Sequence, residues 1–241
     1  MPDAIFTHPR LAAIYDAFDG DRSDLGLYLG IVEEFQAAHV LDIGCGTGSL
    51  PHLLAARGKQ VTAVDPAQAS LEVAQAKTTT PGITWILGDA TTIPKDTPKA
   101  DLATMTGNVA QVFLEDRDWA ATLRGIHDAL RPGGVLVFET RRPERRAWEG
   151  WARDPGPHTR DVPGVGVVEE RRAVTEVRPP FVSFRYTYTF QNGETVHSDS
   201  TLRFRDREEV TRSLDDAGFT VLDVRDAPDR PGLEYVFIAA R

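Results

Sequence analysis

The sequence has almost no cysteine and no long apolar run, and each lack excludes a class of protein. A single cysteine, Cys45, among 241 residues rules out an internal disulfide, as is usual for a protein kept in a reducing compartment. No apolar stretch approaches the roughly 20 residues of a membrane-spanning helix. The start, Met1-Pro2-Asp3-Ala4, also lacks a signal-peptide pattern. We therefore expect a cytoplasmic protein with no membrane partner.

Basic residues are in short supply as well. The chain has 27 Lys and Arg against 36 Asp and Glu, a net charge of −9, and such a balance disfavours the broad phosphate-binding surface of a nucleic-acid protein. Hydrophobic residues make up 41% and charged residues 26%, as in ordinary globular chains. The length fits one α/β domain with an elaboration.

The most informative stretch is the segment 40–50, Val-Leu-Asp-Ile-Gly-Cys-Gly-Thr-Gly-Ser-Leu. An apolar run ends near an acid, three glycines follow on alternate positions, and a helix-compatible stretch comes next, which indicates strand, tight loop and helix. Glycines let a ligand lie against the main chain beside unpaired helix amides. The spacing G-x-G-x-G differs from the G-x-G-x-x-G of dinucleotide enzymes, so it disfavours NAD. A plain strand-turn-helix without a ligand is the alternative.

Two further acids follow apolar strands. Asp65 ends the strand that starts at Gln60 and lies 21 residues after Gly44. A carboxylate at this position can accept hydrogen bonds from both hydroxyls of a ribose. Pro66 is expected to open the next helix, and Asp65 could equally cap that helix. Asp89 follows a third strand, Ile83 to Gly88, and by itself could be a turn residue.

Together these features resemble the class I S-adenosylmethionine-dependent methyltransferases, whose motif I is D/E-x-G-x-G-x-G. The resemblance implies S-adenosylmethionine as cofactor and S-adenosylhomocysteine as product. It assigns the loop to the methionine end of the cofactor, Asp65 to the ribose, and Asp89-Ala90 to the adenine. The implied cofactor residues are Asp42, Gly44, Cys45, Gly46, Asp65, Pro66, Asp89, Ala90, Thr106 at the end of the fourth strand, and Tyr15, from a Tyr-Asp pair near the methyl donor.

The same resemblance implies the fold. We expect an α/β Rossmann-like seven-stranded, mostly parallel sheet flanked by helices, in the order 3-2-1-4-5-7-6 with the last strand antiparallel. Residues 1–37 would form an N-terminal helical cap, 38–140 with 206–241 the core, and 141–205 an inserted antiparallel β lid. The motifs carry the resemblance over 38–140, and the topology carries it over 206–241.

The lid prediction depends on residue alternation. From Val165 to Arg205 the period is two, and Asn192-Gly193 marks a hairpin turn. Four aromatic residues fall on one face: Phe184, Tyr186, Tyr188 and Phe190. This face could serve packing, substrate contact or a homodimer through the lid.

A basic aromatic stretch precedes the lid. Arg141, Arg142, Arg145 and Arg146 stand with Trp148 and Trp151. Beside the cleft, these cations could receive an acidic or phosphorylated substrate, or they could line a solvated helix.

The acceptor is expected to be a small molecule. Where DNA and glutamine N-methyltransferases carry an Asn-Pro-Pro-Tyr run, this chain has Thr-Gly-Asn-Val, residues 106–109. Asn108, Gln111 and Arg141 are the substrate contacts that we predict, although Asn108 and Gln111 could simply stabilise their loop. The expected function is methyl transfer to nitrogen or oxygen by in-line displacement, mainly through positioning.

No catalytic residue is assigned. His158, His197 and Glu139 are candidate bases by location alone. No metal is expected, because Asp101 begins rather than ends the fourth strand. Two other functions remain open at this point: a non-catalytic S-adenosylmethionine-binding sensor or assembly partner on the same fold, and NAD-dependent reduction.

Overall fold

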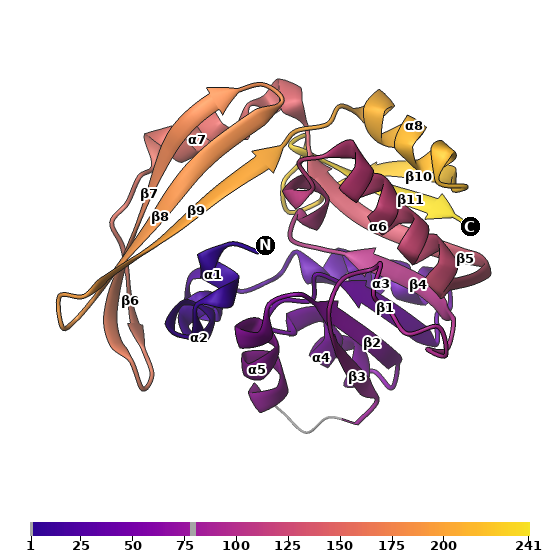
Figure 1. Ribbon diagram of the computed structural model, residues 1–241, viewed down its shortest axis with the longest axis horizontal. Coiled ribbons are helices and arrows are strands. Elements are labelled where there is room, and N and C mark those ends of the chain that lie inside the picture. The colour runs from indigo at the N-terminus through magenta and orange to yellow at the C-terminus, as the bar shows by residue number, and fades with distance from the viewer. Residues whose placement is uncertain (1, 78–80) are drawn as a thin grey trace.

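The chain forms two separate β-sheets connected by helices (Figure 1). In a computed structural model that describes residues 2–77 and 81–241, the core sheet has the order β10-β11-β5-β4-β1-β2-β3 and the lid sheet the order β6-β7-β8-β9. The core strands are β1 (His39–Ile43), β2 (Gln60–Asp65), β3 (Ile83–Leu87), β4 (Ala100–Met105), β5 (Leu130–Arg141), β10 (Thr220–Asp226) and β11 (Glu234–Ala240). The lid strands are β6 (His158–Val162), β7 (Gly166–Arg178), β8 (Phe181–Phe190) and β9 (Thr195–Arg203).

The predicted strand order is confirmed, with β10 and β11 as the sixth and seventh strands of the core sheet. Strands β1 to β5 pair in parallel, whereas β11 runs antiparallel to both β5 and β10. The central strands read as unbroken apolar runs because helices cover both faces of the sheet. Their carboxyl ends meet at one edge, where ligands bind in open parallel sheets.

Helices cover the two faces of the core sheet. Trp119 and Leu214 come from α6 (Asp116–Ala129) and α8 (Arg207–Asp216) and belong to the apolar cluster of one face. Leu25, Leu54 and Leu71 come from α3 (Leu25–Glu34), α4 (Ser49–Ala55) and α5 (Gln68–Lys77) and belong to the cluster of the other face. Within residues 2–77 and 81–241, no helix combines the length and apolarity needed to cross a membrane.

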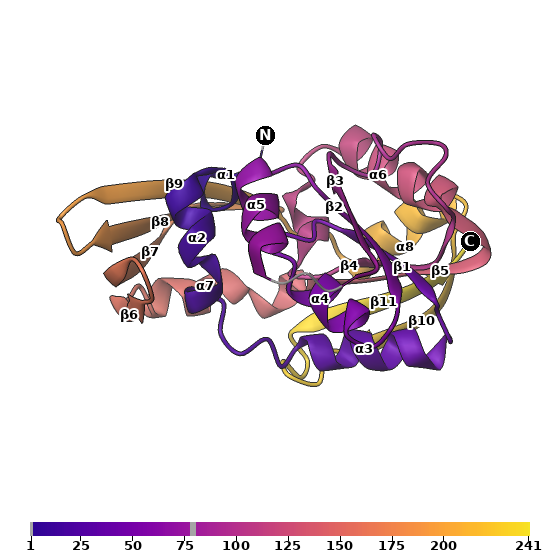
Figure 2. The ribbon, with the colours of Figure 1, turned by 90° about the horizontal axis from the view of Figure 1, so that it is seen from below.

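Two short N-terminal helices lie between the lid sheet and the core (Figures 1 and 2). Leu11 and Ile14 of α2 (Pro9–Phe18) share a third apolar cluster with Val168, Tyr188 and Phe190 of the lid. The same helix and α1 (Ala4–Thr7) also contact α5 of the core. The first helices therefore join the lid to the core.

The structure differs from the sequence-based expectation at several boundaries. Helix α5 begins at Gln68, so Pro66 lies in the preceding turn and does not open the helix. The segment 1–37, predicted as one cap, packs in two different places. Helices α1 and α2 pack on the lid, whereas α3 packs on the core sheet. Residue 1 lies outside the described residues. Strand β5 continues to Arg141, which pairs with Glu234, so the lid follows this residue.

Candidate functional site

The glycine loop leaves bare backbone at the carboxyl end of β1. Gly44 and Gly46 have φ of 73° and 53°, a region that glycine adopts without strain. A Cβ atom at Gly44 would lie 2.6 Å from Cγ2 of Val109, so only glycine fits there. A Cβ at Gly46 would meet nothing within 4 Å, so this part of the loop faces open space. The loop can therefore receive a ligand against its main chain.

Asp65 lies beside this loop at the end of β2. Its Oδ2 accepts a hydrogen bond from the Gly46 amide at 2.8 Å, and its Oδ1 accepts one from the Ala67 amide at 2.8 Å. Burial raises the pKa of this carboxyl group, against the lowering effect of the two amides. Each oxygen keeps a further lone pair for a hydroxyl donor. Asp65 thus fixes the loop and the turn before α5, and both roles foreseen for it are compatible with this geometry.

Asp42 is buried beneath the loop. Its Oδ1 accepts a hydrogen bond of 2.7 Å from the Thr104 hydroxyl of β4. Burial raises the pKa of Asp42 to about 7, although this hydrogen bond lowers it. The neighbouring Cys45 side chain packs in the core cluster with Leu50, so only its backbone can face a ligand.

Asp89 has a more local role than the pattern of strand-terminal acids suggested. It is exposed, and its Oδ1 accepts from the Thr91 amide at 2.8 Å and from the Thr91 hydroxyl at 2.6 Å. This is the turn role that the sequence left open. Ala90 is buried against the core, Pro66 is exposed, and no hydrogen bond joins Asp89 to Asp42 or Asp65 among the described residues. An adenine contact by Asp89 and Ala90 stays a prediction.

Helix α2 is tied to the glycine loop. The Thr47 hydroxyl donates to Asp16 Oδ1 at 2.6 Å, and Lys77 of α5 forms an ion pair with Asp16 at 2.5 Å. Tyr15 precedes Asp16 and packs against Phe6 in a tilted arrangement, with ring centroids 5.5 Å apart. Burial raises the pKa of Tyr15 and keeps it neutral. Asp16 of the pair therefore contacts the glycine loop, whereas a cofactor contact by Tyr15 stays a prediction.

A buried polar network supports the end of β4. Thr106 is buried there, and the Asn108 amide after it donates to Glu139 of β5, whose other oxygen accepts from the Tyr28 hydroxyl. The Asn108 side chain donates to Glu234 at 3.0 Å, while its own Oδ1 is buried without a partner. Burial raises the pKa of Glu139 to about 7. The network fixes the loop that follows β4, so the loop-stabilising role of Asn108 is confirmed.

Arg141 connects this loop to the lid. Its Nη1 donates to Gln111 Oε1 at 2.9 Å, and its guanidinium carbon lies 5.3 Å from the ring centroid of Trp151 in α7 (Ala147–Arg153). Burial lowers the pKa of Arg141. Gln111 is itself buried in the 3₁₀ turn Val109–Val112. Gln111 and Arg141 therefore lie together, whereas the substrate role of each stays a prediction.

The three candidate bases have other surroundings. Both oxygens of Glu139 already accept hydrogen bonds. His158 belongs to β6 and lies 3.4 Å from Asp154. His197 pairs with Thr187 across β8 and β9, on the face opposite the aromatic side chains. Within residues 2–77 and 81–241, no group of three or more His, Cys, Asp and Glu side chains is placed to hold a metal ion.

The basic stretch after β5 does not form the cationic cluster that the sequence suggested. Arg142 donates to the Glu234 carbonyl and pairs with Asp226 at 3.0 Å, and Arg145 donates to the Gly232 carbonyl. Arg146 pairs with the exposed Glu149. Of the four arginines, Arg141 alone contacts the loop after β4. Arg142 and Arg145 hold the turn before α7 to the segment before β11, whereas Arg146 pairs within α7.

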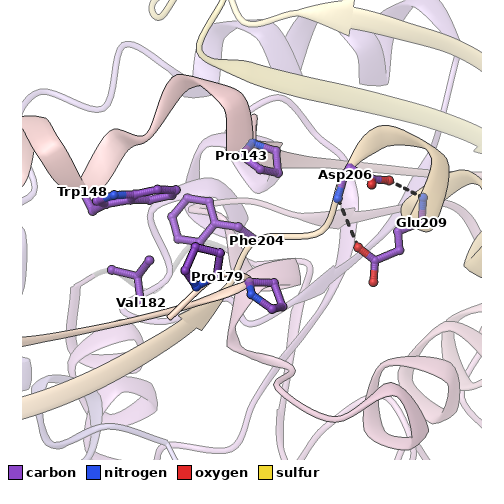
Figure 3. A pocket seen from close by; sticks show the side chains of 8 residues that line it. Pro143, Trp148, Pro179, Val182, Phe204, Asp206 and Glu209 are labelled. Atoms are coloured by element: carbon purple, nitrogen blue, oxygen red, sulfur yellow. Dashed lines mark hydrogen bonds between the residues drawn. The ribbon is translucent and has the colours of Figure 1, made fainter. Parts of the chain in front are cut away.

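An apolar cavity lies apart from this site, at the junction of the lid and the core (Figure 3). It measures about 230 Å³ and lies between α7, the turn from β7 to β8, and the start of α8. Its lining residues are Pro143, Trp148, Pro179, Pro180, Val182, Phe204, Asp206 and Glu209. Asp206 and Glu209 form the capping box of α8, so its polar rim is already satisfied.

Three features of the site were not found from the sequence. The sequence does not predict the bond from Tyr28 to Glu139, the bond from Asn108 to Glu234, or the bond from Thr47 to Asp16. The sequence signal for Glu234 is its place as a lone acid beside the apolar strand Tyr-Val-Phe-Ile-Ala. An acid that is buried with such a strand needs a partner.

Comparisons with known proteins agree with this geometry. The family described as "Methyltransferase domain" matches residues 40–134. Malonyl-[acyl-carrier protein] O-methyltransferase from Salmonella typhimurium is 33% identical over 78% of this chain and 67% of that protein. The enzyme of the same name from Serratia marcescens is 29% identical over 88% of this chain and 76% of that protein.

Solved structures show the same fold. A S-adenosylmethionine-dependent methyltransferase from Clostridium acetobutylicum matches with a TM-score of 0.76 at 18% identity, over 97% of this chain and 98% of that chain. An amino pentose methyltransferase from Micromonospora echinaspora, solved with S-adenosylmethionine bound, matches with a TM-score of 0.71 at 22% identity, over 95% and 96%. Both the core and the lid are thus shared with solved proteins.

Proposed function

Since the chain belongs to the class I S-adenosylmethionine-dependent methyltransferases and uses S-adenosylmethionine as its cofactor, we propose that it methylates a nitrogen or oxygen of a small molecule. The observation that carries the proposal is the enclosure of the glycine loop. Thr47 of the loop bonds to Asp16 of α2, and α2 in turn packs against the lid. A site closed by a helix and a sheet favours a small acceptor over a polymer.

The residues at the loop fit the cofactor. The open space at Gly46 lies next to the Asp65 carboxylate, which can accept from ribose hydroxyls. In our proposal Gly44 and Gly46 hold the methionine end, Asp65 holds the ribose, and Asp89 with Ala90 holds the adenine. The cofactor supplies a methyl group on a sulfonium, which is already activated for in-line attack.

What remains for this chain is to position the acceptor and to exclude water. In our proposal, Tyr15 of α2, next to the loop-bound Asp16, and the Gln111–Arg141 pair position the acceptor. Holding two reactants in line can account for about 7 to 11 kcal/mol of a reaction barrier. The proposed mechanism therefore needs no covalent intermediate and no protein nucleophile.

The side chains around the site favour an acceptor that needs little help from a base. The Glu139 carboxylate already accepts hydrogen bonds from Tyr28 and Asn108. His158 and His197 belong to the lid strands. An amine that arrives deprotonated, or an oxygen that is already ionised, fits this arrangement.

A methyl-transfer assay with a panel of small amines, hydroxy compounds and carboxylates tests the proposal. The assay follows S-adenosylhomocysteine and the methylated product together. The variant Gly46→Ala should lose cofactor binding, because its methyl group enters the open space beside Asp65. Gly193→Ala is the matched control, since Gly193 also has positive φ and open space but lies in the lid hairpin. Cofactor binding without any methylated product across the panel would contradict the proposal and favour a sensor.

A further inference from the structure

Two guanidinium groups from different parts of the fold lie near the ring of Trp151 in α7. The guanidinium carbon of Arg141 is 5.3 Å from its ring centroid, and that of Arg172 is 5.6 Å away. Arg141 ends β5 of the core sheet, whereas Arg172 belongs to β7 of the lid. One cation from the core and one from the lid thus lie near the same aromatic ring.

Arg172 has no carboxylate partner within ion-pair distance among the described residues. Its Nη1 donates to the Tyr186 hydroxyl at 3.3 Å, and its Nε is buried without any hydrogen-bond partner. The nearby Glu170 accepts instead from the Tyr188 hydroxyl at 2.8 Å. A buried donor without a partner destabilises the fold, so its presence requires an explanation.

The arginines on the other face of the lid behave differently. Arg171 pairs with Glu169 at 2.8 Å, and Arg185 pairs with Asp199 at 2.6 Å. These residues alternate with Arg172 and Tyr186 along the strands, so they lie on the opposite face of the sheet. The outer arginines are neutralised by neighbours, whereas the arginine of the aromatic face is not.

Arg141 is only weakly neutralised as well. Its nearest carboxylate oxygen, Glu234 Oε1, lies 3.8 Å from its Nε. That oxygen already accepts from Arg230 Nη1 at 2.9 Å and from Asn108 Nδ2 at 3.0 Å. Arg141 therefore keeps hydrogen-bond donors that are not used within the chain, and it lies next to Gln111 of the predicted acceptor site.

We propose that an anionic group of the methyl acceptor, a carboxylate or a phosphate, binds between Arg141 and Arg172 beside Trp151. This inference rests on the proposed function, because it names the chemistry of that enzyme's acceptor. Guanidinium groups bind such anions with two parallel charged hydrogen bonds. The anion gives the unused donors of Arg141 and Arg172 a partner. It acts as a handle that orients the acceptor, while a separate nitrogen or oxygen receives the methyl group.

Anion binding can be measured without turnover. The full chain, loaded with S-adenosylhomocysteine, is titrated in a calorimeter with malonate, with inorganic phosphate, and with the neutral malonamide. We expect binding of one or both anions and none of malonamide, and Arg172→Gln should weaken the anion by about tenfold. The two anions distinguish a carboxylate site from a phosphate site. Equal affinity in the wild type and in Arg172→Gln would overturn the proposal.

Matched variants separate recognition from folding. Arg171→Gln removes the same charge from the same strand on the outer face and should leave anion binding unchanged. Arg172→Lys keeps the charge but not the paired donors and should restore part of the affinity. All variants should bind S-adenosylhomocysteine like the wild type. If Arg171→Gln weakens the anion as much as Arg172→Gln does, general lid charge explains the binding and the site is wrong.

Turnover then tests the two proposals separately. Acceptors are compared in pairs that differ only by a carboxylate or phosphate remote from the amine or hydroxyl. We expect methylation of the anionic member in preference, with a preference that Arg172→Gln removes through a higher KM. Equal methylation of both members would leave the methyltransferase proposal intact and contradict the anionic handle. Anion binding without methylation of any compound would support the handle and count against the proposed function.

Discussion

Asp65 connects two backbone segments and, in the proposed function, also holds the ribose. Asp65→Ala should weaken S-adenosylhomocysteine binding by about 1 to 3 kcal/mol, because charged hydrogen bonds are lost and the amides of Gly46 and Ala67 lose their acceptor. Asp65→Asn keeps one acceptor oxygen and should fall between this variant and the wild type. Calorimetry measures the effect, with the exposed Asp96→Ala as control. Unchanged affinity in Asp65→Ala would exclude the ribose contact.

Asp42 shows how burial links stability to pH. Its pKa is raised from 3.8 to about 7 in the folded protein, chiefly by desolvation. The folded state therefore binds the proton more tightly than the unfolded chain, and the free energy of unfolding falls as pH rises from about 4 to 7. Above pH 7 the protein carries the full cost of a buried carboxylate.

Asp42→Asn should remove this pH-dependent cost. The amide can still accept from the Thr104 hydroxyl. We expect the stability of the variant, relative to the wild type without cofactor, to rise by about 2 to 3 kcal/mol between pH 5 and pH 8. Urea unfolding at several pH values measures the difference between the two proteins. A difference that does not change with pH would mean that the Asp42 pKa is near its ordinary value.

At the scale of single elements, helix α8 has its ends encoded in sequence. A capping box is present, since the Glu209 amide donates to Asp206 Oδ1 at 2.7 Å and the Glu209 carboxylate accepts from the Asp206 amide. Asp206→Ala should lower the free energy of unfolding by about 1 kcal/mol, because a helix amide loses its acceptor. Chemical denaturation checks this value. Asp215→Ala, in an exposed position of the same helix, should change stability less, and an equal loss would remove the capping explanation.

The lid strands show what a two-residue period can predict. The aromatic residues at 184, 186, 188 and 190 do share a face, and the Asn192-Gly193 turn joins β8 to β9 as expected. Tyr188 and Phe190 pack against α2 of the same chain, so packing is confirmed for that end of the face. Strand β6, at the edge of the lid sheet, was not predicted from the sequence. Its five residues contain only one buried apolar side chain, Val162. Because Tyr188 and Phe190 are covered within the chain, a homodimer through the lid would have to use other lid residues, and it stays a prediction.

At the scale of the whole molecule, α1 and α2 join the lid to the core. Leu11 of α2 is fully buried and packs in one cluster with residues of the lid strands. Leu11→Ala should lower the free energy of unfolding by about 2 to 5 kcal/mol through the cavity it creates. It should also raise amide exchange in β6, β7 and β8 more than in β1 and β4. Leu53→Ala is the same substitution at an exposed position and should have little effect. Uniform exchange across both sheets would indicate that the lid does not depend on α2.

The sequence by itself determined the core fold and the cofactor. The glycine loop, the strand-terminal acids and the hairpin turn are local patterns, and local sterics and hydrogen bonding decide them within a few residues. Motif spacing then placed Asp42, Gly44, Gly46 and Asp65 at one edge of the sheet, because parallel strands bring their carboxyl ends together.

Only the tertiary structure decided which charged groups are free to act. Glu139 is occupied because Tyr28, 111 residues earlier, donates to it. Arg142 and Arg145 are tied to the segment before β11. Arg172, which nothing in the sequence singled out, lies near the same Trp151 ring as Arg141. The partners of a side chain come from distant segments that packing brings together. Composition and spacing carry no record of those contacts, so the proposed acceptor site depends on the folded chain.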